Sequence, residues 1–303
     1  MTVVVLAGGT GGAKLARGML DVVGDEELVV VANTGDDVDI YGAHVSPDPD
    51  LCTFWLADRI DERGWGIDGD TFTVMDGLRA LGVDVWFNLG DRDLAVCIER
   101  RRRLDAGERQ TEAHAAISAA LGVGARVLPM SDEPVRTRIK ADGTWWAFQD
   151  FMIRHGAQGP IEDVEFAGAD EATVTAEVRA AITDARAIVI GPSNPVVSIG
   201  PILAVPGMAD ALQASSAPVV AVSPIVGGAV VKGPTEACMK WAGHELSAAG
   251  IAEAYQGLID GLVADEDPHA TAIPVILTDT MMNDRASREH VARSTLDFAL
   301  GIN

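Results

Sequence analysis

The densest cluster of chemically active side chains lies in the segment NTGDDVDIYGAHVSPDPD, residues 33–50. It has no lysine or arginine, and its five acidic side chains are Asp36, Asp37, Asp39, Asp48 and Asp50. A carboxylate about 4 Å from a phosphate oxygen repels it by roughly 1 kcal/mol in water and roughly 4 kcal/mol in a partly buried cleft. A helix N-terminus stabilises a bound anion by only about 0.3–1 kcal/mol. These carboxylates can therefore share a cleft with a diphosphate only if a cation lies between them.

Mg²⁺ suits such a cluster, because it prefers hard oxygen ligands and usually keeps several waters, so that one or two aspartates suffice. The cluster follows an apolar run, and we expect Asp36 and Asp37 to lie at the carboxyl end of a strand, beside the glycine turn described next. For a single member, such as Asp36 or Asp48, the alternative is a side chain that only caps a turn.

A glycine-rich turn, AGGTGGAKL at residues 7–15, separates the apolar run Val3–Leu6 from an amphipathic segment. In a strand, turn and helix arrangement it offers backbone amides to an anion, and the candidate contacts are Gly9, Thr10, Gly11, Gly12 and Lys14. Leu15 follows the lysine, so the magnesium-binding hydroxyl of a P-loop is missing. Lys14 also replaces the third glycine of the dinucleotide motif. A phosphate site and a turn used only for packing both remain possible interpretations.

Two further loops follow apolar runs. NLGDRDLA, residues 88–95, contains Asn88, Asp91 as a helix cap and Arg92 as a fork for phosphate or carboxylate. We expect it at the carboxyl end of a strand, Val83–Phe87. The alternative is a turn whose polar side chains bond only to one another and bind no ligand.

IGPSNPVVSIGPIL, residues 190–203, holds Ser193, Asn194 and Ser198 between prolines, which suits hydrogen bonding to phosphate, ribose or base. The alternative is an Asx-type turn entering a helix. Lys232, between glycines, is a weaker candidate.

Composition excludes several classes of function. A formal net charge of −22 opposes binding to nucleic acid or to an anionic membrane surface. The three cysteines are isolated, which favours neither zinc nor disulfides, and there is no GxSxG or HExxH motif. No export signal or membrane-spanning run is found. We expect a cytoplasmic protein.

Apolar runs alternate with helical patterns, which is typical of an α/β fold with buried parallel strands. Expected strands are Val3–Leu6, Leu28–Ala32, Val83–Phe87, Ala187–Ile190, Val219–Val222 and Pro274–Leu277. Expected helices are Thr53–Glu62, Leu94–Asp105, Thr111–Leu121, Ala172–Asp184, Ala252–Asp260 and Ser287–Leu300. The pattern predicts one Rossmann-like unit over residues 1–303, with a mostly parallel sheet flanked by helices.

One region departs from this pattern. RTRIKADGTWWAFQDF, residues 136–151, alternates on either side of Asp142-Gly143, which indicates an antiparallel β-hairpin. We therefore expect a smaller inserted lobe, roughly residues 127–168, that could cover a site.

Read in order, GGTGGAK, NTGDD, SPDPD, LGDRD, LPMSDEP, FQDF and GPSNPVVSIGPIL resemble the 2-phospho-L-lactate transferase family of coenzyme F420 biosynthesis. The likeness extends over nearly the whole chain. It implies transfer to the deazaflavin Fo from a guanosine diphospho donor that carries lactate or, in bacterial members, enolpyruvate. The terminal ribityl hydroxyl of Fo attacks phosphorus, GMP leaves, and Mg²⁺ is required. The resemblance also implies a Rossmann-type core, a smaller lobe and a homodimer.

By the same resemblance, Asp36 and Asp50 match family aspartates associated with the metal and with the reacting end of Fo. Asn88, Asp91 and Arg92 match the region near Fo or the transferred group, and Ser193 and Asn194 fall on the nucleotide side. Glycine turn, acidic loop and rigid loops together are consistent with phosphoryl transfer by positioning and charge neutralisation. Asp50 is also our candidate base for the hydroxyl proton.

Two rival functions fit part of this pattern. A non-enzymatic, sugar-nucleotide-binding regulator of the gluconeogenesis-factor type shares the glycine turn, but it has a different loop in place of GPSNPVVSIGPIL and lacks LGDRD. A nicotinamide dehydrogenase is disfavoured by Asn33, which stands where a ribose-binding acid is needed. Lactate, enolpyruvate and glycerate differ by too little for the sequence to choose among them.

Overall fold

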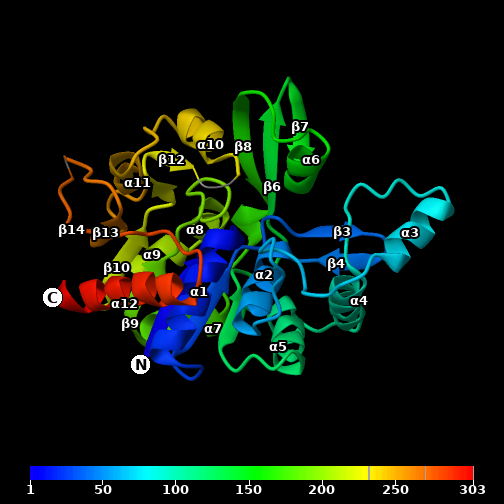
Figure 1. Ribbon diagram of the computed structural model, residues 1–303, viewed down its shortest axis with the longest axis horizontal. Helices are drawn as coiled ribbons and strands as arrows, with labels where there is room; N and C mark the ends of the chain where they lie inside the picture. The colour runs from blue at the N-terminus through cyan, green and yellow to red at the C-terminus, as the bar shows by residue number, and fades with distance from the viewer. Residues whose placement is uncertain (231–232, 270, 303) are drawn as a thin grey trace.

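A computed structural model describes residues 1–230, 233–269 and 271–302. Its centre is a parallel sheet of seven strands in the order β14-β13-β10-β9-β1-β2-β5 (Figure 1). The strands are β1 (Thr2–Ala7), β2 (Leu28–Ala32), β5 (Arg126–Pro129), β9 (Ala185–Ile190), β10 (Val219–Val222), β13 (Gly261–Ala264) and β14 (Val275–Leu277). The predicted fold class is confirmed. The chain leaves β1 toward β2 on one side and later returns to β9 on the other, so the direction of winding reverses beside β1.

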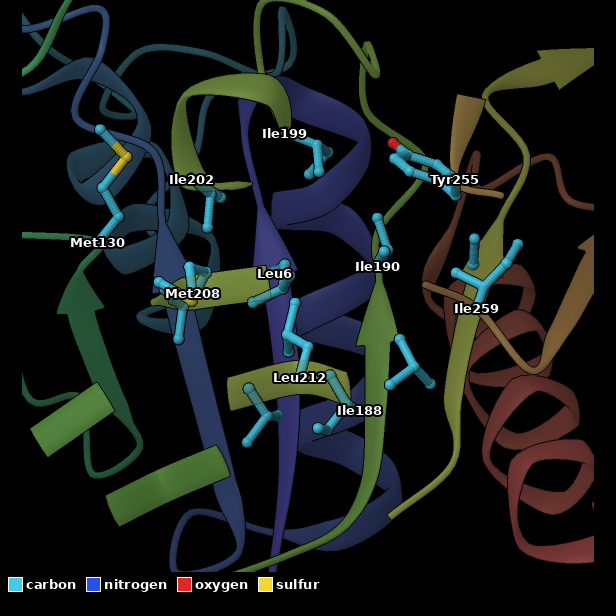
Figure 2. Close-up of a cluster of buried hydrophobic side chains, with 14 of the residues drawn as sticks. Leu6, Met130, Ile188, Ile190, Ile199, Ile202, Met208, Leu212, Tyr255 and Ile259 are labelled. Atoms are coloured by element: carbon cyan, nitrogen blue, oxygen red, sulfur yellow. The ribbon is translucent and has the colours of Figure 1, made fainter. Parts of the chain in front are cut away.

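Alternate residues of the central strands face two separate cores, because successive side chains of a strand point to opposite faces. Val3 and Val5 pack with three helices, α1 (Gly9–Val23), α2 (Pro47–Leu56) and α12 (Arg285–Gly301). Val4 and Leu6 pack against the other layer: α7 (Ala176–Thr183), α8 (Gly200–Ala204), α9 (Met208–Gln213) and α11 (Ala248–Ala254). Figure 2 shows this second core, with Leu6 and Ile188 between the sheet and α9.

The predicted strand Val83–Phe87 is wrong. Residues 83–87 form no strand, and the strand beside β2 is β5, which was not predicted. The apolar side chains of Val85 and Phe87 instead pack on a small satellite core around Met75 and Leu94. The run is therefore hydrophobic because it packs within the segment between β2 and β5, and it does not form a strand of the sheet.

The segment between β2 and β5 is an excursion from the sheet. Besides α2 it contains β3 (Val38–Ile40), β4 (Ala43–Val45), α3 (Thr73–Ala80), α4 (Asp91–Asp105) and α5 (Gln110–Ala120). In Figure 1 it extends away from the sheet, with α3 at its far end. The excursion brings the amino end of α2 back to the carboxyl edge of the sheet.

A second excursion forms the lobe: β6 (Arg136–Ala141), β7 (Thr144–Ala147), α6 (Phe148–Ile153) and β8 (Ile161–Ala167). The predicted hairpin is confirmed, since β6 and β7 pair antiparallel around Asp142 and Gly143, both with positive φ. Its sheet begins at Arg136 rather than near Val127, because residues 126–129 belong to β5. That residues 1–303 fold as one unit stays a prediction.

The remaining elements are η1 (Ala169–Glu171), β11 (Ile225–Val226), β12 (Ala229–Val230) and α10 (Thr235–Ala242). Among the residues that the structure describes, none of the helices combines the length and apolar character needed to cross a membrane.

A buried histidine gives the fold a measurable acid sensitivity. His114 is 1% exposed, its Nε2 lies 3.0 Å from Thr53 Oγ1, and its Nδ1 finds no partner among the described residues. Burial, with a smaller contribution from Arg100, lowers the pKa of His114 to about 3. Since the unfolded chain binds a proton near pH 6.5, the folded state loses stability as pH falls from there toward 3.

We therefore expect His114→Gln to remove part of this loss. Between pH 7 and pH 5 the wild type should lose about 2 kcal/mol more unfolding free energy than the variant. Urea unfolding at both pH values measures the difference. Equal losses in the two proteins would show that His114 does not titrate as the geometry requires.

Candidate functional site

Two adjoining cavities lie at the carboxyl edge of the sheet. The first cavity, about 520 Å³, opens at the ends of β1, β9 and β10. The second cavity, about 480 Å³, lies between α2, residues 87–90 and the lobe helix α6. Asp36 lines the first cavity, while Asp48 and Asp50 line the second. A ligand in one cavity can therefore meet a ligand in the other close to the acidic loop.

The glycine turn forms one wall of the first cavity, with Gly9, Thr10, Gly11 and Lys14 in its lining. Gly9 has φ +68°, which favours glycine. A Cβ at Gly11 would lie 2.0 Å from Pro192 O, and one at Gly12 would lie 2.8 Å from Ser193 Oγ. The turn thus needs glycine for packing and also presents backbone to the cavity.

This turn is also suited to an anion. Helix α1 begins at Gly9 with no acidic residue in its first turn. Asp48 accepts a hydrogen bond from the amide of Gly9, while the amides of Thr10 and Gly11 have no side-chain partner among the described residues. Lys14 faces the cavity without an ion pair among the described residues, and burial lowers its pKa. Free amides at a helix N-terminus next to an unpaired ammonium group attract a phosphate.

Two buried carboxylates converge opposite that turn on a single amide group. Asn33 Nδ2 lies 3.1 Å from Asp36 Oδ1 and 2.9 Å from Asp48 Oδ2. Asp48 also accepts a hydrogen bond from Gly9 N at 2.7 Å, and the two side chains are 8% and 4% exposed. Neither forms an ion pair within the described part of the chain, so their charges are uncompensated.

The electrostatics of this pair reflect that lack of compensation. Burial, and then repulsion by Asp48, raise the pKa of Asp36 well above its usual range. Burial raises the pKa of Asp48 to about 6, against the hydrogen bonds from Asn33 and Gly9. Such a pair takes up either a proton or a cation near neutral pH.

The other aspartates of the loop hold the local backbone in place. Asp37 accepts hydrogen bonds at 2.7 Å from both Ser46 Oγ and Gln110 Nε2. Ser46 is the residue immediately before α2, so Asp37 fixes the start of the helix that carries Asp48. Asp39 lies 2.6 Å from His44 Nδ1, with a largely exposed side chain. Asp37 and Asp39 therefore stabilise the local backbone, which is the alternative to a role in binding a metal.

The expected metal site requires Asp50 to lie beside Asp36, but the structure does not place it there. Asp50 forms a two-pronged ion pair with Arg100, which is fully buried and also donates a hydrogen bond to His44 O at 3.0 Å. Asp48 and Asp50 are two residues apart on α2, so they point to different sides of the helix. The residue that joins Asp36 is therefore Asp48.

The LGDRD turn is displaced from the sheet edge, because no strand precedes it. Asp91 does not cap the helix that follows it, because it is the first residue of α4 and Gly90 is the N-cap. It accepts hydrogen bonds from Thr71 Oγ1 and from the amides of Thr73 and Val74, and so stabilises the start of α3. Arg92 donates to Asp68 O at 3.0 Å and lines neither of the two cavities. It faces a separate hollow beside α4 and α5.

Of the three predicted site residues in this segment, Asn88 is the one that reaches the site. It lines the second cavity and accepts a hydrogen bond from Arg79 Nη2 at 2.7 Å.

The loop after β9 packs directly against the glycine turn, and its Ser193, Asn194 and Ser198 all line the first cavity. Asn194 Oδ1 accepts hydrogen bonds from Val196 N at 2.9 Å and Val197 N at 3.1 Å, so the Asx turn is confirmed. The same loop therefore forms an Asx turn and lines the first cavity. Lys232 lies outside the described residues.

Sequence reasoning missed several residues of the site. Asn33 was considered only as an argument against a dinucleotide, yet its place directly after β2 could have marked it. Arg63 and Trp65 line both cavities but lie in a loop that carries no recognisable motif. Residues 280–283, which line the first cavity, also carried no signal.

The carboxylate pair predicts a stability effect in the absence of divalent cations. Asp36→Asn should raise the unfolding free energy by about 1–2 kcal/mol at pH 7.5, because it removes a buried charge that faces Asp48. The gain should shrink near pH 4, where the raised pKa leaves Asp36 protonated in the folded wild type. Urea unfolding in EDTA measures both values.

Asp163→Asn, an exposed change in β8, is the matched control and should have little effect at either pH. If Asp36→Asn were destabilising at pH 7.5, the two carboxylates would not be repelling each other.

Comparison with known proteins agrees with this arrangement. The family model for "2-phospho-L-lactate transferase CofD" matches residues 3–290. A 2-phospho-L-lactate transferase of Methanosarcina mazei is 40% identical over 268 residues, 88% of each chain. A phosphoenolpyruvate transferase of Mycobacterium avium is 38% identical over 333 residues, 99% of each chain. One from Streptomyces griseus is 40% identical over 313 residues, 99% of this chain and 98% of the relative.

A solved structure shares the fold. A member of the UPF0052 family from Bacillus halodurans superposes with a TM-score of 0.63 at 16% identity, covering 98% of this chain and 100% of that one. At that identity the likeness extends to the architecture alone. With a family model that spans nearly the whole chain and relatives near 40% identity, the chain belongs to the 2-phospho-L-lactate transferase CofD family and is a transferase.

Proposed function

We propose that this chain moves a phosphorylated three-carbon acid from a guanosine diphospho donor to the terminal ribityl hydroxyl of Fo, releasing GMP, in the biosynthesis of coenzyme F420. The observation that carries the proposal is the position of the Asp36–Asp48 pair, where a cavity suited to phosphate meets a second cavity. The names of the relatives, 2-phospho-L-lactate transferase and phosphoenolpyruvate transferase, support the same chemistry.

The donor occupies the first cavity in this proposal. Its diphosphate lies against the amino end of α1 and Lys14, where amides and an ammonium group compensate its charge. Its guanosine lies toward Ser193, Asn194 and Ser198, whose short polar side chains suit ribose and base.

A magnesium ion fits the residues at the junction. Asp36 and Asp48 offer hard oxygen ligands, and their raised pKa values show that they lack a compensating charge. Asp50 fits poorly, because Arg100 already occupies both of its oxygens. When bound, the ion would neutralise phosphate oxygens and polarise the phosphorus toward attack.

Fo occupies the second cavity, whose aromatic lining suits a planar ring: Phe54, Trp65, Phe72 and Phe87. Asp50 lines the same cavity, where burial raises the pKa of its carboxyl against the opposing effect of Arg100, which already binds both of its oxygens. Asp50 is therefore better suited to accept a hydrogen bond from the ribityl hydroxyl, and so orient it, than to retain its proton. In the transfer, the hydroxyl oxygen bonds to phosphorus, the bond from phosphorus to the GMP oxygen breaks, and the hydroxyl proton passes to solvent.

Other parts of the hypothesis stay predictions: a homodimer, a cytoplasmic location, and the identity of the acid. The gluconeogenesis-factor alternative predicts nucleotide binding without turnover, which the following assay would reveal.

The test incubates purified protein with Fo and MgCl₂ and with the lactyl or the enolpyruvyl donor, and follows GMP and product mass. We expect one phosphodiester product from the preferred donor. Asp36→Asn and Asp48→Asn should each lower the rate at least about 100-fold, because charge neutralisation at phosphorus is lost. The exposed change Asp163→Asn should keep the wild-type rate.

No product from either donor, despite nucleotide binding, would favour the regulator over the transferase. Full activity in both Asp36→Asn and Asp48→Asn, with wild-type turnover intact, would remove the carboxylate pair from the reaction.

A further inference from the structure

The loop between Ile60 and Ile67 separates the two cavities. Its ends are joined by an antiparallel bridge between these two residues. Asp61 N donates to Gly66 O at 2.8 Å, and Gly64 N donates to Asp61 O at 3.0 Å. The loop therefore has a defined shape. Among the residues that the structure describes, Arg63 and Trp65 alone line both cavities.

The charge around Arg63 is unusual. The second cavity is lined by four carboxylates, those of Asp48, Asp50, Asp70 and Asp93. Among the described residues that line the two cavities, Arg63 is the single cation of the second, and Lys14 is the one other cation of the first. Among the described side chains, Arg63 is thus the cation that an anion can contact from both cavities.

The guanidinium of Arg63 is held in place and still has free capacity. Its Nε and Nη2 lie 2.7 Å and 2.5 Å from Asp61 Oδ2. Its central carbon lies 5.9 Å from the centroid of the Trp65 ring. Half of the side chain is exposed, and Nη1 has no hydrogen-bond partner among the described residues. The planar fork can thus be fixed on one side and bind an anion on the other.

We propose that Arg63 binds the phosphate of the group in transfer, at the junction between the donor and the acceptor. This inference rests on the proposed function, and it adds a residue that touches the transferred group itself. Because the phosphate borders the junction before and after transfer, Arg63 would contact it in the donor, in the transition state and in the product. GMP alone does not reach this position.

The experiment compares Arg63→Met, Arg63→Lys and the control Arg59→Met. Arg59 is an exposed arginine in the same segment, and its side chain faces the hollow beside α4 and α5 rather than either cavity. We expect Arg63→Met to lower kcat about 100-fold, Arg63→Lys to recover about 10-fold of that loss, and Arg59→Met to have no effect. KM for Fo should change by less than about 3-fold.

Calorimetry provides a readout that does not depend on turnover. Arg63→Met should weaken binding of the intact enolpyruvyl donor by about 10-fold or more and binding of GMP by less than about 3-fold. Equal affinities for the intact donor in wild type and Arg63→Met, with equal kcat, would overturn the inference.

These outcomes separate the two proposals. An inactive wild type would contradict the proposed function, and the difference between intact donor and GMP would still decide whether Arg63 binds the transferred phosphate. An active wild type with an equally active Arg63→Met would contradict this inference alone. Thermal unfolding of each variant checks that it is folded. If Arg63→Met does not fold, the same comparisons are made with Arg63→Lys.

Discussion

Two buried carboxylates share one amide at the carboxyl edge of the sheet, and the rest of the site depends on this contact. Asp36 and Asp48 both accept from Asn33, while no arginine or lysine among the described residues pairs with either. Removing an ionised carboxylate from water costs several kcal/mol unless a partner compensates it. The pair therefore requires a proton or a cation, and a ligand that brings a cation removes the penalty.

The fold brings this pair to the phosphate site through two excursions from a parallel sheet. Asp36 lies in the turn that follows β2, whereas Asp48 returns to the sheet edge on the first turn of α2. Asp37 fixes that return through Ser46 and Gln110. The second excursion supplies α6, which lines the second cavity. In Figure 1 the first excursion extends to the right with β3, β4 and α3, and the second stands at the top with β6, β7 and β8.

The parts that follow from local sequence were predictable. The buried strands β1, β2, β9 and β10 each contain an apolar run of at least four residues, and the hairpin follows from Asp142-Gly143. The glycine turn and the Ser193-Asn194 loop could be placed at one sheet edge, because parallel strands end together.

What the sequence alone could not resolve depends on long-range packing. Choosing Asp48 over Asp50 requires knowing where α2 begins and that Arg100, 50 residues later, occupies Asp50. The apolar run before LGDRD belongs to a satellite core, which no local pattern distinguishes from a strand. Arg63 reaches the junction only because the excursion folds its loop back over the glycine turn, so that Gly64 lies near Thr10.

A crystal structure of the protein with GDP and Mn²⁺, a substitute for Mg²⁺ that scatters anomalously, tests the central claim most directly. The account predicts one anomalous peak that touches the diphosphate and carboxylate oxygens of both Asp36 and Asp48. A bound diphosphate with no peak between it and these two side chains, or with both of them turned away from the nucleotide, would contradict it.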